Sequence, residues 1–190
     1  GDESGGGHWN NRSIELSADG TIIAIGAFGN DGNGRDSGHV RVYKYNPSKS
    51  TAQTNQSLAG FGPIGWDRLG DDIDGEAIDD YSGFNVSLSA DGTIIAIGAG
   101  FNNNYTGNVR VYRYNSSKTT ANSLGPIGWD QIGGDIDGEA INNFSGDSIS
   151  ISADGTIVAI GGSQNSGNGT QAGHVRVYKY NPSKSTAQTN

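Results

Sequence analysis

Ser17-Ala18-Asp19-Gly20-Thr21-Ile22-Ile23-Ala24-Ile25-Gly26 is the stretch that decides the fold, because the chain spells it three times. The same ten residues return at 89–98, and again at 152–161 with Val in place of one Ile. After each copy come a Gly- and Asn-rich stretch and a second repeated strand, at 38–45, 107–114 and 173–180. Repeats of this length are structural units that cannot bury their apolar faces alone. The repeat therefore predicts a series of similar units that pack on one another.

The Ser-Ala-Asp-Gly tract is predicted to be the turn of a β-hairpin, because Asp supplies a hydrogen-bonding side chain and Gly supplies a positive φ. Before the turn, Val86 and Leu88 alternate with small polar residues, which predicts a first strand. After it, residues 93–97 are β-branched or apolar at nearly every position, which indicates a second strand buried on both faces. The repeated turn aspartates are Asp19, Asp91 and Asp154.

Two further strands complete each unit. The third alternates strictly, with Val109 and Val111 on one face and Arg110 and Tyr112 on the other. A fourth strand is predicted at 127–132, with a counterpart at 64–69, and a proline precedes each. Its Trp129 and Trp66 are expected to be packing anchors. The predicted fold class is all-β, with antiparallel four-stranded blades in a β-propeller-like repeat.

The repeat divides the chain into three units that together form one repeat domain. Residues 1–63 hold the first three strands and a linker, and residues 64–126 and 127–190 each hold a fourth strand followed by the next three. No segment shows a helical period, and a β-solenoid usually has a shorter repeat without such hairpins, but a multi-sheet sandwich is an open alternative. The third unit lacks its fourth strand, although residues 174–190 repeat residues 39–55 without a change. Either the chain is a segment of a longer repeat protein, or a neighbour supplies the strand by β-augmentation.

These residues resemble a known repeat. The order of motifs in each unit is similar to the FG-GAP repeat of integrin α-subunit propellers and large extracellular repeat proteins. This order is an aromatic residue, Ser-Gly, the Ser-Ala-Asp-Gly-Thr tract, Gly-Ala and then Gly-x-Val-Arg-Val-Tyr. The "FG" position is Ser82-Gly83 and Ser145-Gly146, and the "GAP" position is Gly26-Ala27, Gly98-Ala99 and Gly161-Gly162. The resemblance covers nearly the whole chain and implies an extracellular interaction scaffold. That family often carries an Asp-rich calcium loop at the hairpin turn, whereas this turn has one carboxylate, too few ligands for calcium.

Composition narrows the class of partner. The net charge of −8 argues against nucleic acid and anionic membranes, since both require a basic surface. No apolar run approaches 18 residues, so membrane insertion is not expected. The chain has no Cys, which removes thiol chemistry, and no Met, so it is expected to be a processed chain or an excerpt of a larger one.

The acidic connection after the fourth strand is the strongest candidate for a chemical site. Closely spaced oxygen ligands around a Gly turn suit calcium, but a full EF-hand register is absent. The alternative is a solvated turn whose acids accept backbone hydrogen bonds. The candidate metal ligands are Asp72, Asp74, Glu76, Asp135, Asp137 and Glu139.

Three other sets of residues recur. Arg41, Arg110 and Arg176 are expected to stack or to pair with a neighbouring blade's carboxylates, and a basic stripe is the alternative. The loops between the second and third strands are Gly- and Asn-rich and carry Phe101 and Tyr105 in one copy, so they are candidate binding loops. The sequons of Asn11, Asn55, Asn104, Asn115 and Asn168 are candidate glycosylation sites, and the alternative is that a sequence rich in Asn, Ser and Thr forms sequons by chance. The sequons of Asn85 and Asn143 lie beside predicted inner strands and are poorer acceptors.

The sequence therefore predicts a non-enzymatic structural or adhesive module of a secreted or surface protein, which assembles through strand edges and loops. Its expected partners are copies of itself or further repeats of the same chain. The alternative is a calcium-dependent module that binds a ligand or a glycan. An enzyme such as a glycosidase ranks third, because repeated acids are more often structural than catalytic.

Overall fold

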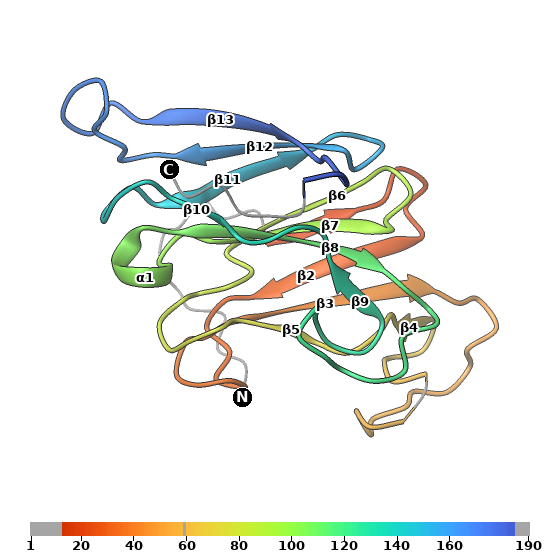
Figure 1. The fold of residues 1–190 in the computed structure, drawn as a ribbon. Coiled ribbons are helices and arrows are strands. Elements are labelled where there is room, and N and C mark those ends of the chain that lie inside the picture. The colour runs from red at the N-terminus through yellow and green to blue at the C-terminus, as the bar shows by residue number, and fades with distance from the viewer. Residues whose placement is uncertain (1–12, 59, 185–190) are drawn as a thin grey trace.

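The computed structural model describes residues 13–58 and 60–184, and these fold into three antiparallel β-sheets stacked face to face (Figure 1). In Figure 1 the stack runs from the first sheet in orange, through the second in green, to the third in blue. The predicted fold class is thus confirmed as all-β with antiparallel sheets. The sheets do not close into a barrel, and closure into a propeller stays a prediction.

Strand order within each sheet follows chain order. The first sheet contains β1 (Ile14–Leu16), β2 (Ile22–Ala27), β3 (His39–Tyr45), β4 (Trp66–Arg68) and β5 (Ile73–Asp74). The second contains β6 (Asn85–Leu88), β7 (Ile94–Ala99), β8 (Asn108–Tyr114), β9 (Trp129–Gln131) and β10 (Ile136–Asp137), with the four-residue helix α1 (Asn102–Tyr105) in the loop before β8. The third contains β11 (Ser145–Ile151), β12 (Ile157–Gly162) and β13 (His174–Lys179).

The fourth strand of each full sheet is broken into two short pieces. Both β4 and β5 pair with β3, and both β9 and β10 pair with β8. The strand that contains Trp66 therefore belongs to the sheet of the strands that precede it, whereas the unit 64–126 counted along the sequence begins with it. Within residues 145–184 no strand pairs with the outer edge of β13, as expected for the third unit.

The hairpin turns form as their sequence predicts. Asp91 accepts hydrogen bonds from the Ser89 hydroxyl at 2.7 Å and from the Thr93 backbone N–H at 3.0 Å. Gly92 adopts a φ of 69°, which favours glycine. Asp19 and Asp154 make the same bonds in their turns. The serine, the aspartate and the glycine thus fix the turn, and the apolar residues that follow enter the sheet in register.

Two hydrophobic cores lie between the sheets. In the first, Val40 and Val42 of β3 pack with Ile95 and Ile97 of β7, and all four are at most 1% exposed. In the second, the equivalent valines of β8 and the other face of β7 pack with Val158 and Ile160 of the third sheet. The second sheet therefore presents one apolar face to the first sheet and the other to the third. This explains why β7 is apolar at nearly every position.

Glycines let successive sheets approach closely. A Cβ atom at Gly26 would collide with the backbone carbonyl of Gly83, and a Cβ atom at Gly98 would collide with that of Gly146. These four residues are the glycines of the "GAP" and "FG" positions. The two halves of the repeated motif thus contact each other across the junction between sheets.

Candidate functional site

The acidic connections of the first two sheets lie against the third strand of the next sheet. The connection after β5 contacts β8, and the connection after β10 contacts β13. Each junction gathers side chains from equivalent positions. The first junction cluster is Asp74, Glu76, Ser82, Asn108 and Arg110, and the second junction cluster is Asp137, Glu139, Ser145, His174 and Arg176.

Arg110 is the centre of the first junction cluster. Its side chain is only 8% exposed, and its guanidinium donates to the Asp74 carbonyl oxygen at 2.7 Å and to the Ser82 hydroxyl at 3.3 Å. The guanidinium lies 3.9 Å from the Glu76 carboxylate and 5.7 Å from the centre of the Tyr112 ring. Asn108 also donates to Glu76, at 3.3 Å. The buried charge is thus paired with groups of the preceding sheet, as a buried guanidinium requires.

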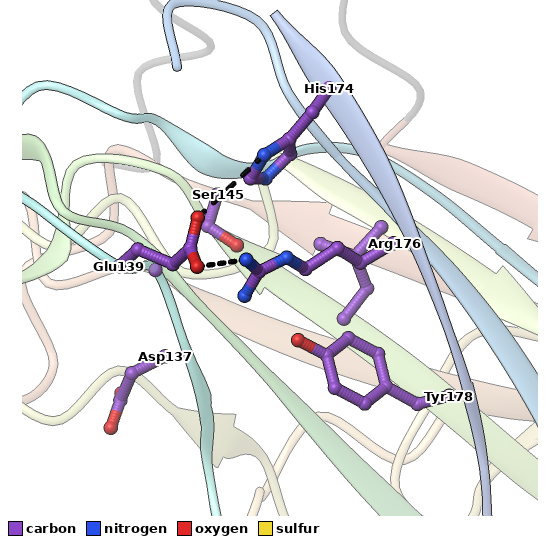
Figure 2. Close-up of a pocket in the computed structure, with 8 residues that line it drawn as sticks. Asp137, Glu139, Ser145, His174, Arg176 and Tyr178 are labelled. Atoms are coloured by element: carbon purple, nitrogen blue, oxygen red, sulfur yellow. Dashed lines mark ion pairs between the residues drawn. The ribbon is translucent and has the colours of Figure 1, made fainter. Parts of the chain in front are cut away.

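Figure 2 shows the second junction cluster, in which the Glu139 carboxylate lies between His174 and Arg176. Glu139 forms an ion pair with Arg176, and its other oxygen lies 3.8 Å from His174 Nδ1. Asn165 donates to the same oxygen at 3.3 Å. The carboxylate of Asp137 points away from Arg176 in this view. In this cluster the Glu139 carboxylate of the second sheet thus contacts both His174 and Arg176 of the third.

The equivalent arginine of the first sheet has its carboxylate partner within the same sheet. Arg41 pairs at 2.9 Å with Asp72 of its own sheet, and Arg68 lies 3.0 Å from the same carboxylate. Burial alone would raise the pKa of Asp72, but hydrogen bonding and charge from Arg41, with the charges of His39 and Arg68, lower it below its usual range. Asp72 therefore stays ionised as the partner of two arginines.

Burial shifts other acids in the opposite direction. Burial, together with the charge of Asp72, raises the pKa of Asp74. Burial raises the pKa of Glu76, and the charge of Arg110 offsets part of this effect. Burial and the charge of Asp135 raise the pKa of Asp137. These acids lie in a partly desolvated seam between the sheets.

The six candidate calcium ligands do not converge on one point. Asp72, Glu76 and Glu139 bind arginines, and Asp135 accepts a hydrogen bond from Gln131 at 2.6 Å. Among residues 13–58 and 60–184, no three His, Asp or Glu side chains are grouped so that they could hold a metal ion. Calcium binding by these connections stays a prediction.

A small recess adjoins the second junction cluster. Asp137, Glu139, His174, Arg176 and Tyr178 are among its lining residues (Figure 2). The recess offers a volume of about 10 Å³, which is room for about one water molecule. The recess is therefore a gap in the packing of two sheets, too small for an organic substrate.

The tryptophans of the two fourth strands differ in their surroundings. Trp129 is fully buried, and its indole N–H donates to the Leu69 carbonyl oxygen of the first sheet at 3.0 Å. Trp66 is half-buried and packs on Tyr45, with ring centres 5.5 Å apart. Trp129 thus joins two sheets, whereas Trp66 contacts a residue of its own sheet.

Sequence reasoning missed a recurrent pair of lysines, of which Lys118 is buried and Lys49 is half-buried. Lys118 donates to the Trp129 carbonyl oxygen at 2.7 Å and pairs with Asp130 at 2.9 Å, and Lys49 makes the same contacts with Trp66 and Asp67. The signal was present, because a Ser-Lys pair follows the third strand at the same offset in every unit. These lysines fix the loop that leads to the fourth strand.

The loops at one end of the sheets hold an aromatic cluster that sequence reasoning saw only in part. Phe101 lies at its centre, with ring centres 4.9 Å from Tyr81 and 5.7 Å from Tyr105. Phe28, Phe84 and Phe144 complete it. Most of these rings are buried or half-buried, but Tyr105 is 46% exposed. The cluster joins loops that lie far apart in the sequence.

The sequons divide by exposure. Asn55, Asn104 and Asn168 are exposed, whereas the Asn115 side chain donates to Asp130 at 2.7 Å. Asn85 and Asn143 are 4% and 5% exposed. Asn11 lies outside the described residues. Occupancy of the sequons stays a prediction.

No model of a known protein family matches the chain, and no curated protein sequence matches it. In the part of the chain that the structure describes, no helix is long and apolar enough to cross a membrane.

Proposed function

We propose that this chain is a non-enzymatic structural or adhesive module of a secreted or surface protein, in which sheets stack in series to form a rigid scaffold. The observation that supports this most directly is the recurrence of the junction clusters. Equivalent residues, Glu76 with Arg110 and Glu139 with Arg176, join successive sheets. Residues that recur because they join neighbouring units are typical of repeat scaffolds.

The chemistry of the recurrent side chains supports the same function. The repeated acids contact arginines, the repeated lysines bind backbone carbonyl oxygens, and the turn aspartates bind hydroxyl and N–H groups. The recess beside Arg176 has room for about one water molecule. A scaffold role accounts for these contacts without a bound substrate.

An extracellular location is part of the proposal. Three sequons present exposed asparagines, and the chain is acidic and has many Gly and Asn residues in surface loops. The resemblance to extracellular FG-GAP repeats points the same way.

Isothermal titration of the full chain with CaCl₂, followed by thermal unfolding in calcium and in EDTA, tests the proposal. A structural module should give no binding heat and the same melting temperature in both buffers. Saturable heat together with a higher melting temperature in calcium would contradict it and would favour a calcium-dependent binding module.

The aromatic cluster favours a second candidate function, the binding of a glycan at the loop end of the sheets. An exposed aromatic ring offers an apolar face with a polar edge, and Tyr105 is the most exposed ring there. Glycan-array binding that Tyr105→Ala abolishes would support this function. No binding by the wild-type chain would remove it.

A further inference from the structure

Within residues 13–58 and 60–184, no strand covers one apolar face of the third sheet. Val175 and Val177 of β13 are each 68% exposed. Their equivalents in the first sheet, Val40 and Val42, are at most 1% exposed because the second sheet covers them. With Ile157, which is 40% exposed, these two valines form what we call the tail face.

At the other end of the stack, no described strand covers the complementary face of the first sheet. Ile14 and Leu16 of β1 are 59% and 54% exposed. Their equivalents in the second sheet, Val86 and Leu88, are 2% and 7% exposed because they pack on the first sheet. Ile14, Leu16, Ile23 and Ile25 form what we call the head face.

A ladder of backbone hydrogen bonds runs along the hairpin turns. Ala18 N–H donates to the Ala90 carbonyl oxygen at 2.8 Å, and Ala90 N–H donates to the Ala153 carbonyl oxygen at 2.9 Å. Within the described residues, no hydrogen bond engages Ala153 N–H at the tail or the Ala18 carbonyl oxygen at the head. Among the described residues, the ladder thus ends in an unused N–H donor at one end and an unused carbonyl acceptor at the other.

The same turns pack on the preceding sheet in a repeated way. The α-carbon of Gly92 lies against Ile22, and that of Gly155 lies against Ile94, so that a Cβ atom would collide with either isoleucine. Ile157 is the next isoleucine of this series and has no glycine on it. Gly20 is the matching glycine at the head, and a Cβ atom there would meet nothing within 4 Å.

We propose that the tail face binds the head face of a second copy of this chain. The contact would reproduce the two internal junctions, with Val175 and Val177 against Ile23 and Ile25, Ile157 against Gly20, and Ala153 N–H on the Ala18 carbonyl oxygen. The six residues of β13 repeat the first six of β3, which already packs on such a face. The inference rests on the proposed scaffold function and names its partner.

Charge does not oppose this contact. Arg110 and Arg176 take their carboxylate partner from the preceding sheet, but Arg41 at the head is already paired with Asp72 of its own sheet. Docking a tail face there leaves no guanidinium buried without a partner. Because head and tail are different surfaces, the contact is heterologous and gives a ring if the rotation closes or a filament if it does not.

Sedimentation velocity of the full chain, with one variant for each face, tests the inference. Val175→Asp/Val177→Asp blocks the tail, Ile14→Asp/Leu16→Asp blocks the head, and Ile141→Asp is the matched control, because Ile141 is 63% exposed and lies on neither face. The wild-type and control chains should associate in multiples of 19.7 kDa as their concentration rises. Each blocked variant alone should stay monomeric, and an equal mixture of the two should form a species of two chains and nothing larger.

Three results would overturn the inference. The wild-type chain could stay monomeric up to several hundred micromolar, or a blocked variant could still associate alone. The third result is that the mixture fails to pair although both variants keep the wild-type circular dichroism spectrum. Amide exchange of the wild-type chain needs no variant, and Ala153 N–H should exchange more slowly at high concentration. A monomeric wild-type chain would exclude the second copy as the partner. It would not bear on the scaffold proposal, which the calcium titration tests separately.

Discussion

At the scale of single residues, the turn aspartates hold their hairpins through charge-assisted hydrogen bonds. Hydrogen bonds from the Ser152 hydroxyl and from Thr156 lower the pKa of Asp154 from 3.8 to about 2. A carboxylate with a lowered pKa in the folded state contributes stability above its unfolded pKa. That contribution is lost as the pH falls through the folded value.

We therefore expect the third hairpin to weaken between about pH 4 and pH 2. An NMR titration of the Asp154 carboxyl carbon should give a midpoint near pH 2. In Asp154→Asn, the fall in stability over this range should be smaller than in the wild-type chain. A midpoint near 3.8 would show that the turn hydrogen bonds do not favour the ionised form.

Residue exposure also predicts which sequons a secretory cell would modify. If the chain is expressed through a eukaryotic secretory pathway, Asn55, Asn104 and Asn168 should carry glycans, because their side chains are exposed. Asn85 and Asn143 should stay bare, because they are nearly buried. Glycopeptide mass spectrometry measures this directly, and a glycan on Asn143 in a folded chain would contradict the packing described here.

At the scale of elements, the glycines of β2 and β7 set the distance between sheets. In Gly98→Ala, the new methyl group would meet the Gly146 carbonyl oxygen of the next sheet. Such overpacking typically costs about 1–3 kcal/mol. Urea unfolding measures the loss. Gly134→Ala is the matched control, because a Cβ atom there meets nothing within 4 Å, and its stability should match the wild type.

Arg110 of β8 should contribute more to the stability of the fold than Arg113 on the same strand. Removing the buried guanidinium in Arg110→Ala leaves the Asp74 carbonyl oxygen without its donor, and we expect a loss of about 2–4 kcal/mol in the free energy of unfolding. Arg113 is exposed, so Arg113→Ala should change stability by less than about 0.5 kcal/mol. Equal losses in the two variants would indicate that the junction contact contributes little.

Elements with a strong local pattern could be predicted from the sequence. The hairpins and the third strands were predicted correctly, because apolar alternation and Asp-Gly turns act within a few residues. The break of the fourth strand into β4 and β5 was not, because it depends on which partner strand lies beside it. The helix α1 was missed as well, since its Asn103 and Asn104 have a positive φ and no helical pattern marks it.

The junction clusters were half predicted, for a similar reason. The recurrence of Arg41, Arg110 and Arg176 indicated a partner on a neighbouring unit. The sequence could not show that Glu76 and Glu139 are close to two of these arginines, because the partners lie 34 and 37 positions apart and meet only when the sheets stack. Spacing along the chain instead grouped these acids with one another as metal ligands.

At the scale of the whole molecule, the fold is a series in which each sheet depends on its neighbours. The middle sheet is covered on both faces, and each outer sheet keeps one apolar face exposed. Stability in such a series is close to a sum of unit and junction terms. Burying an exposed valine or isoleucine side chain contributes about 1.5–3 kcal/mol of favourable free energy. Burial of these side chains would therefore favour association of the head and tail faces.

The central claim is that the acidic connections join successive sheets through their arginine contacts, a role that needs no calcium. Urea unfolding of the wild-type chain and of Glu76→Gln/Glu139→Gln, each in calcium and in EDTA, tests this claim most directly. Both carboxylates are partly exposed, so the free energy of unfolding of the double variant should fall by only about 1 kcal/mol. The loss should be the same in both buffers. A wild-type chain that calcium stabilises, with a response that the double variant lacks, would contradict the account.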